Sequence, residues 1–198
     1  MNISIDIDGV LTNGFVDAFA AAVRKTGVEV PNGYSPTDYA FSDIVPTYKT
    51  QEMLAATYAT PDLWESMSEL PGAVELANSL FDLQKDRIDV YLLTHRPKAP
   101  GKTSQVQTWN WMRQRGLVHP NTSLIVVGSS AVKSRIIESL DIKFSLDDLP
   151  KTVFACNEIP GHQAYLMDAT WNQNVPSYFE NWRVRSVAEF LKIVIDNF

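Results

Sequence analysis

The stretch SIDIDGVLTNG (residues 4–14) decides the fold, because it sets two aspartates at the end of an apolar strand. Strands tolerate aspartate poorly, so the pair needs a compensating role. Asp6 and Asp8 lie two residues apart in extended chain, which puts their carboxylates on one side, and Gly9 lets the backbone turn directly after them. A pair of turn or helix-capping aspartates is the alternative interpretation. On this stretch alone, the two interpretations carry equal weight.

Apolar runs typical of buried strands alternate with amphipathic runs typical of helices through most of the chain. This alternation predicts an α/β fold, a Rossmann-like parallel sheet sandwiched by helices. The expected strands are 2–6, 88–94, 123–128, 143–148 and 164–168. The expected helices are 15–27, 50–59, 71–83, 102–116, 129–140 and 187–195.

Residues 15–70 interrupt this alternation, since they contain helical patterns and a loop rich in Pro, Tyr and Asp but no strand-like run. We therefore expect a small helical cap at 15–70, inserted after the first strand, and a core formed by 1–14 and 71–198. Ligands of open parallel sheets bind beyond the carboxyl ends of the strands. An insertion leaving the first strand would lie over that crevice.

Composition excludes several classes of function. The formal net charge of −6 and the absence of a basic run argue against strong nucleic-acid binding or binding to anionic membranes. No apolar stretch approaches the ~20 residues of a membrane-spanning helix. The single cysteine, Cys156, forms no internal disulfide, and a first strand starting at Asn2 leaves no room for a leader, so we expect a cytoplasmic protein.

Polar residues follow two later strands. Thr94 ends the strand at 88–94 and His95 follows it, so that a hydroxyl and a loop of backbone N–H groups are placed to suit an anion. Asp147 and Asp148 end the strand at 143–148. With Asp6 and Asp8, four carboxylates would converge at one edge of the sheet. So much negative charge calls for a cation, and all-oxygen ligation suits Mg²⁺.

Lys133 lies in the first turn of the helix expected at 129–140, which Ser129 or Ser130 would cap. A solvated surface lysine is the more frequent outcome for any single lysine. The order of the motifs favours a functional role for Lys133 instead. Carboxylates, a hydroxyl, this lysine and two further carboxylates occur at four successive strand or helix ends.

These motifs resemble those of the haloacid dehalogenase-like superfamily of phosphohydrolases: DIDGV (6–10), LLT (92–94), a lysine on a helix, and DD (147–148) after an apolar strand. The resemblance covers the whole chain in order, and the helical insertion is similar to that superfamily's type 1 cap. The set of motifs is specific, although each motif alone is not.

The resemblance implies a role for each matching residue. Asp6 would be the nucleophile that forms an aspartyl-phosphate, and Asp8 the general acid and then the base. Phosphate oxygens would be held by Thr94, Lys133 and, at the same loop, His95. Mg²⁺ would bind the Asp6 carboxylate, the Asp8 main-chain oxygen and Asp147, with Asp148 helping directly or through a neighbouring ligand.

A narrower resemblance is to the 5'(3')-deoxyribonucleotidases, carried by LWESMSELPGAVELANSL (63–80), DIDGVLTNGF (6–15), SLDDLP (145–150), DATWN (168–172) and NWRVRSVAEF (181–190). It implies that Trp64 helps form a nucleobase pocket. Phe15, Tyr34, Tyr39 and Phe41 could add to this pocket, or could form the core of the cap instead.

The LLT motif (92–94) departs from the pattern of the deoxyribonucleotidases, in which a serine typically follows the threonine. Here His95, Arg96 and Pro97 follow it. The spacing from Lys133 to Asp147 is also longer than we expect in that family. Both departures concern the substrate rather than the chemistry. For Arg96 three positions stay open: on phosphate, on a carboxylate of the cap, or facing water.

Other notable residues receive structural interpretations. Trp109, spaced three residues from Val106 and from Met112, is expected in the core, and Trp111 is expected to be exposed. Trp171 is expected to pack against the sheet. No spacing of histidines with Cys156 suggests a zinc site.

Three hypotheses follow. The first is a Mg²⁺-dependent phosphatase of nucleoside 5'-monophosphates, preferably deoxyribonucleotides. The second is the same core acting on another monoester, such as a polynucleotide end or a sugar phosphate. The third is a catalytically silent binding protein of the same fold. The expected partner is a small phosphate ester, and a homodimer remains an option.

Overall fold

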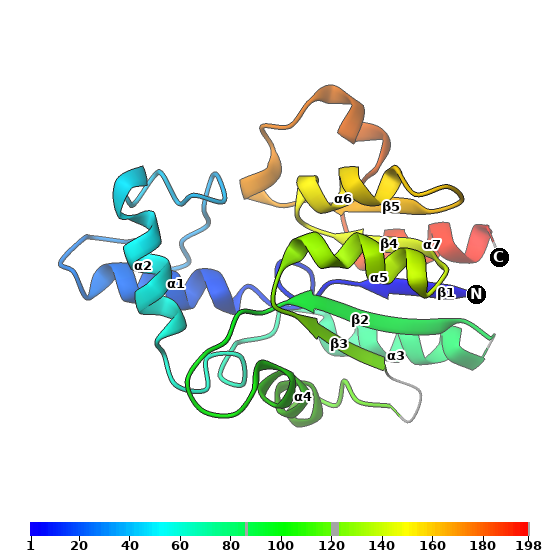
Figure 1. Cartoon of the computed structure of the whole chain (residues 1–198), viewed down its shortest axis with the longest axis horizontal. Helices are drawn as coiled ribbons and strands as arrows, with labels where there is room; N and C mark the ends of the chain where they lie inside the picture. Colours follow the sequence, from blue (N-terminus) through cyan, green and yellow to red (C-terminus); the bar gives the residue numbers. More distant parts are fainter. Residues whose placement is uncertain (86, 120–122, 198) are drawn as a thin grey trace.

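A computed structural model describes residues 1–85, 87–119 and 123–197 (Figure 1). Six parallel strands form one sheet in the order β3-β2-β1-β4-β5-β6. The strands are β1 (Asn2–Ile5), β2 (Asp89–His95), β3 (Ser123–Val127), β4 (Ile142–Asp147), β5 (Gln163–Met167) and β6 (Arg183–Val184). The α/β Rossmann-like sheet predicted from the sequence is confirmed, with β1 near the centre.

Helices cover both faces of the sheet, so each face buries its own apolar cluster. On one face, α5 (Lys133–Ser139) and α6 (Pro150–Asn157) enclose a cluster that includes Val153 and Cys156. On the other, α3 (Ala73–Lys85), α4 (Ser104–Gln114) and α7 (Val187–Asp196) pack against the sheet, with Phe190 of α7 fully buried. The burial of apolar area on both faces is the main force that holds these layers together.

The segment 15–70 contains α1 (Gly14–Arg24), the short 3₁₀ helix η1 (Thr47–Lys49) and α2 (Thr50–Tyr58), and no strand. It has an apolar cluster of its own, in which the rings of Phe19 and Phe41 stack with centroids 3.9 Å apart. Figure 1 places α1 and α2 beyond the carboxyl ends of the strands, while both termini lie at the opposite end of the sheet. The helical content and placement expected for a cap are therefore present; its boundaries stay a prediction.

Three local features differ from the expectations. The helix α6 and the two-residue strand β6 were not predicted. Neither Ser129 nor Ser130 caps α5 with its side chain, because a 3₁₀ turn (η2, Ser130–Val132) intervenes and α5 starts at Lys133. Lys133 still lies in the first turn of α5, so its position relative to the sheet is as predicted.

The prediction for the tryptophans of α4 was wrong. Trp111 is fully buried, whereas Trp109 is exposed to 37% and Val106 to 44%. The buried face carries the polar residues Gln107 and Thr108 beside Trp111. Gln107 donates to the carbonyl oxygens of Pro100 and Lys102 and accepts from the Trp64 N–H, so a polar side chain is fully satisfied in the interior.

The edge strand β3 is covered by one side chain of α4. The Gln105 amide nitrogen donates to the Leu124 carbonyl at 3.1 Å, and its amide oxygen accepts from the Val126 N–H at 3.1 Å. A side-chain amide thus occupies one acceptor and one donor of this edge strand that a further strand could use.

His162 is expected to make folding stability depend on pH. It is buried, its Nδ1 donates to the Ile142 carbonyl at 2.7 Å, and its Nε2 accepts from the Ser145 hydroxyl at 2.9 Å. Burial, assisted by the nearby Lys143 charge, lowers the pKa of His162. Because the unfolded chain binds the proton more readily, this contribution is complete above the unfolded pKa of about 6.5 and is lost as the pH falls below it.

Urea unfolding between pH 5 and pH 8 measures this effect. The free energy of unfolding of His162→Gln should fall less steeply from pH 7 to pH 5 than that of the wild type. Equal slopes for the two proteins would contradict the assignment.

Candidate active site

The turn after β1 brings the first two aspartates to the carboxyl edge of the sheet. The Ile7 carbonyl accepts from the backbone N–H groups of Leu11 at 2.7 Å and Thr12 at 3.1 Å, which closes the turn. Gly9 has φ = 78°, and a Cβ at this position would collide with the Asp148 carboxylate. Only glycine satisfies both conditions, so the glycine of the DIDG stretch is required for two reasons.

Lys133 joins two carboxylates in the interior. Its Nζ donates to Asp6 Oδ2 at 2.5 Å and to Asp147 Oδ2 at 2.7 Å, and its side chain is 3% exposed. The second oxygen of each carboxylate accepts from the backbone, Asp6 Oδ1 from the N–H of Ile7 and Asp147 Oδ1 from that of Leu149. The residue after β1, the last residue of β4 and the first residue of α5 therefore meet in one network, although they are distant in sequence.

Asp148 completes an acidic group with Asp6 and Asp147, in which one carboxylate oxygen from each residue lies within 4.8 Å of the other two. Burial raises the pKa of Asp6 to about 7, although the Lys133 charge opposes the change. Burial and the Asp147 charge also raise the pKa of Asp148 well above its usual range. Burial lowers the pKa of Lys133, but the charges of Asp147 and Asp6 outweigh this and raise it overall.

The donor set of this group fits a hard divalent cation. Three carboxyl groups share one ammonium group, and the raised pKa values of Asp6 and Asp148 show that Lys133 alone does not favour ionisation of all three. Carboxylate oxygens are the ligands that Mg²⁺ prefers, and a buried charge needs a counter-charge. Asp6, Asp147 and Asp148 are thus the residues that would hold it.

Asp8 does not join the other three carboxylates, contrary to the expected convergence of four. Its Oδ2 accepts from Arg96 Nε at 2.8 Å and from the Thr94 hydroxyl at 3.0 Å, and its Oδ1 accepts from Arg96 Nη2 at 2.9 Å. The predicted ligation of metal by the Asp8 main-chain oxygen stays a prediction. The two aspartates of the first motif therefore have separate counter-charges, Lys133 for Asp6 and Arg96 for Asp8.

Two of the positions considered for Arg96 were wrong, because this side chain neither faces water nor pairs with a carboxylate of the cap, but lies in the core and pairs with Asp8. It is 1% exposed. A contact of Arg96 with phosphate stays a prediction. The Thr94 hydroxyl also donates its hydrogen to Asp8. Phosphate binding by Thr94 stays a prediction, and donation to phosphate would require this hydroxyl hydrogen to rotate away from Asp8.

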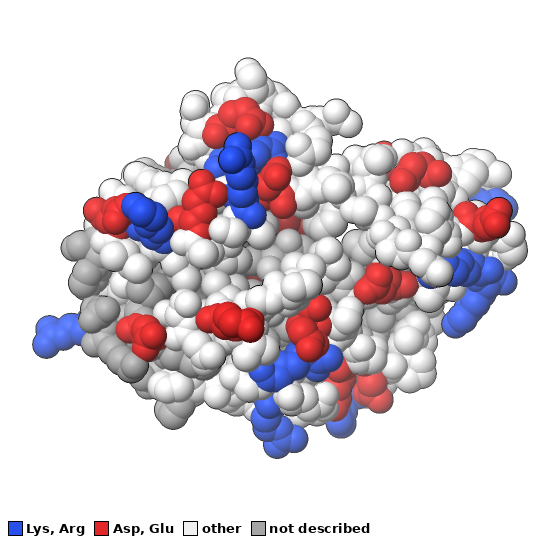
Figure 2. All heavy atoms as spheres, turned by 180° about the vertical axis from the view of Figure 1, so that it is seen from behind, with Lys and Arg blue, Asp and Glu red and all other residues white. Residues whose placement is uncertain are grey.

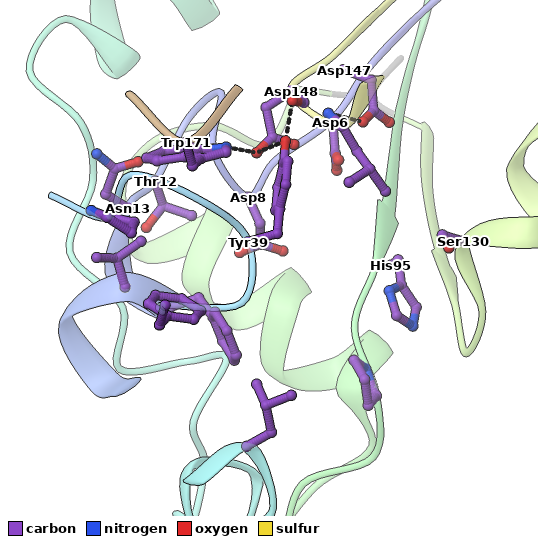
Figure 3. A pocket seen from close by; sticks show the side chains of 18 of the residues that line it. Asp6, Asp8, Thr12, Asn13, Tyr39, His95, Ser130, Asp147, Asp148 and Trp171 are labelled. Atoms are coloured by element: carbon purple, nitrogen blue, oxygen red, sulfur yellow. Dashed lines mark hydrogen bonds between the residues drawn. The ribbon is translucent and has the colours of Figure 1, made fainter. Parts of the chain in front are cut away.

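The acidic group opens into a cavity of about 290 Å³ (Figure 3). Its polar end carries Asp6, Asp8 and Lys133, and the rest is lined mainly by apolar and aromatic side chains from the cap and the core, among them Phe15, Val16, Pro36, Phe41, Leu54, Tyr58, Trp64 and Pro97. Of the residues predicted for phosphate, Lys133 and His95 line this cavity together with the predicted base-pocket residues, whereas Thr94 is buried and is not among the lining residues. Of the cap aromatics considered, Tyr34 is not among the lining residues; its hydroxyl donates to Asp43.

Trp64 and Phe15, the residues predicted for a base pocket, lie together. Their rings are nearly parallel, at 17°, with centroids 6.1 Å apart. Trp64 is only 2% exposed and its indole N–H donates to the Pro97 carbonyl at 2.8 Å. Phe15 is half-buried and so offers more surface to a ligand. Stacking of a base on either ring stays a prediction.

His95 borders the cavity from the end of β2. Its Nε2 lies 3.2 Å from the Gly128 carbonyl, and burial is the main cause that lowers its pKa. The imidazole is therefore neutral near pH 7 and contributes hydrogen bonding rather than charge. Its predicted contact with phosphate stays a prediction.

Two aromatic residues on Asp148 were missed by sequence reasoning. The Trp171 indole N–H donates to Asp148 Oδ2 at 2.8 Å, and the Tyr39 hydroxyl donates to the Asp148 carbonyl oxygen. Figure 3 shows Tyr39 reaching from the cap loop to Asp148 beside Trp171. From the sequence, we expect Tyr39 in the base pocket or in the core of the cap and Trp171 against the sheet, and no spacing in the sequence indicates either contact.

Comparisons with known proteins place the fold. No model of a protein family matches the chain, and no curated protein matches it in sequence. Among solved structures, a hydrolase from Streptococcus pneumoniae TIGR4 is similar with a TM-score of 0.52 and 13% identity, covering 85% of this chain and 92% of its own. A protein from Bacteroides vulgatus, provisionally called a beta-phosphoglucomutase, has a TM-score of 0.51 and 11% identity over 96% and 86% of the two chains. At such identities, the likeness concerns the α/β fold.

Proposed function

We propose that this protein is a Mg²⁺-dependent phosphatase that hydrolyses nucleoside 5'-monophosphates, preferably deoxyribonucleotides, through an aspartyl-phosphate on Asp6. The observation that carries the proposal is the network in which Lys133 bridges Asp6 and Asp147 at one end of a cavity that is otherwise lined mainly by apolar and aromatic side chains. The motif resemblance to phosphohydrolases and the fold shared with a hydrolase support it.

In this proposal, the residues of the chain divide the reaction between them. An Asp6 oxygen attacks phosphorus, and the ester P–O bond breaks while Asp8 gives its proton to the leaving oxygen. Water then attacks the aspartyl-phosphate, Asp8 takes the proton of that water, and phosphate leaves with Asp6 restored. Lys133 offsets negative charge on the transferring group. Bound Mg²⁺ would supply further electrostatic stabilisation of the phosphoryl oxygens.

The lining of the cavity supports a nucleoside as the remaining part of the substrate. Phe15, Phe41 and Tyr58 offer aromatic surface, on which flat bases stack favourably. Lys133 is the one Lys or Arg among the lining residues found in the described part of the chain. A single phosphate with an uncharged remainder fits this lining better than a molecule with a second phosphate. The provisional name of the Bacteroides vulgatus protein keeps sugar phosphates in the test panel.

The surface supports a small substrate over a polynucleotide. Figure 2 shows acidic and basic side chains interspersed over one face, with no continuous basic area. With a net charge of −6, such a surface gives little attraction for a phosphate backbone. None of the helices in the described residues has the length and apolar character needed to cross a bilayer.

Phosphate release from a substrate panel tests the proposal. We expect hydrolysis of nucleoside 5'-monophosphates. The value of kcat/KM for nucleoside 5'-diphosphates and for hexose 6-phosphates should be at least about tenfold lower than that for the monophosphates. A second phosphate would find no further Lys or Arg among the described residues that line the cavity, and a hexose has no aromatic ring to stack. Release confined to sugar phosphates or oligonucleotide ends would overturn the substrate assignment. No release from any monoester would favour the silent binding protein.

A further inference from the structure

The planar guanidinium fork of Arg96 makes a bidentate contact with the Asp8 carboxylate. Its Nε and Nη2 atoms donate to the two different oxygens of the carboxylate, at 2.8 and 2.9 Å. The third bond to this carboxylate comes from Thr94, at 3.0 Å. Both donors belong to the end of β2 and the residue that follows it. A bidentate guanidinium bond fixes the plane of a carboxylate as well as its distance, which a lysine at the same place would not do.

The guanidinium is itself held on every side by the core. Its carbon lies 5.2 Å from the centroid of Trp64 and 5.7 Å from that of Trp111, its Nη1 donates to the Thr108 hydroxyl at 3.1 Å, and its Nη2 lies 3.8 Å from the sulfur of Met67. The side chain is 0% exposed, whereas that of Asp8 is 22% exposed. A rigid, buried cation therefore presents a partly open carboxylate to the cavity.

This arrangement explains why Asp8 stays apart from the acidic group. The ammonium group of Lys133 is already shared by Asp6 and Asp147, so Arg96 is the counter-charge of Asp8. Without Arg96, the hydrogen bond left to the Asp8 carboxylate side chain within the described residues is the one from the Thr94 hydroxyl. The Asp8 side chain would then be free to rotate, and its negative charge would have no counter-charge of its own.

We propose that Arg96 is a positioning residue that holds the Asp8 carboxylate toward the oxygen of the leaving group, a role that rests on the proposed phosphatase function. In the step concerned, the P–O bond to Asp6 forms, the ester P–O bond breaks, and the Asp8 proton passes to the ester oxygen. Proton transfer to a leaving group of low acidity is sensitive to misplacement of the donor, whereas an acidic phenol departs without a proton. The loss of activity on replacement of Arg96 should therefore be larger for leaving groups of low acidity than for acidic ones.

The test compares kcat/KM for three esters: dTMP, phenyl phosphate and p-nitrophenyl phosphate. This constant reports the steps up to the departure of the leaving group and is independent of the later attack by water. For Arg96→Met we expect a loss of about 10²-fold with dTMP, a smaller loss with phenyl phosphate, and less than about tenfold with p-nitrophenyl phosphate. Asp8→Asn should show the same order.

A double variant and a matched arginine separate positioning from folding. Because Arg96 acts through Asp8, the variant Asp8→Asn/Arg96→Met should lose no more than Asp8→Asn alone. Arg115, whose guanidinium carbon also lies 5.0 Å from the Trp111 centroid but which pairs with Glu69, serves as control. Arg115→Met should leave the ratio between the three esters unchanged. If Arg96→Met does not fold, Arg96→Lys, which keeps the charge without the fork, should show the same selectivity with a smaller loss.

Equal losses with the three esters, or losses that multiply in the double variant, would overturn the positioning role and leave the phosphatase intact. A folded wild-type protein that hydrolyses none of the esters would overturn the proposed function, and the role of Arg96 with it.

Discussion

Replacement of Asp6 by Asn is expected to abolish phosphate release from every monoester that the wild-type protein hydrolyses, with a loss of about 10⁴-fold or more. An amide cannot attack phosphorus as a carboxylate does. In the proposed reaction Asp8, which is held by Arg96 and Thr94, transfers protons and does not replace the nucleophile. Initial rates with dTMP and p-nitrophenyl phosphate measure the loss.

This variant should nevertheless remain folded. Lys133 keeps Asp147 as a partner at 2.7 Å, and one carboxyl group is removed from a buried group of three whose full ionisation Lys133 alone does not favour. We expect a thermal unfolding midpoint without added metal that is no lower than that of the wild type. Asp141→Asn is the matched control: this aspartate is exposed, and its φ of 48° suits asparagine. Substantial turnover by a folded Asp6→Asn protein would remove Asp6 from the role of nucleophile.

Removal of divalent cations by a chelator is expected to stop phosphate release, and Mg²⁺ to restore it. The stronger test needs no activity. Because the acidic group exists only in the folded chain, Mg²⁺ at a hundred times its Kd should stabilise the protein by about 2.7 kcal/mol, which corresponds to a rise in Tm of about 5–10 °C. Thermal unfolding at increasing Mg²⁺ concentration measures this rise.

The ligand set can be checked in the same way. Asp147→Asn should show little rise in Tm with Mg²⁺, whereas Asp141→Asn should respond as the wild type does, since it lies outside the acidic group. An equal rise for both variants would place the cation elsewhere. No rise for the wild type would remove the metal from the proposal.

The elements of the sheet were predictable because buried parallel strands are nearly continuous apolar runs. The same regularity places Asp6 and Asp147 at one edge, since parallel strands end together, and their common contact with Lys133 follows. Strand β6 has only two residues, too few for any periodicity to appear. Helix α6 follows its strand after a short connection and has little amphipathic contrast in its sequence.

Contacts set by tertiary packing were not predictable from periodicity. In α4 the apolar spacing selected Trp109, but the buried face contains Gln107 and Thr108, which are satisfied by partners distant in sequence. The pairing of Arg96 with Asp8 is of the same kind. A charged side chain is expected at the surface unless a partner is known, and the partner lies 88 residues away.

The amide of Gln105 has a consequence for self-association. An open sheet edge recruits another chain by offering unpaired N–H and C=O groups, and it is a common origin of aggregation. At β3 the Leu124 carbonyl and the Val126 N–H are already taken by this amide, while the opposite edge strand, β6, is two residues long. A second copy of the chain that paired with β3 at these positions would therefore have to displace the Gln105 side chain.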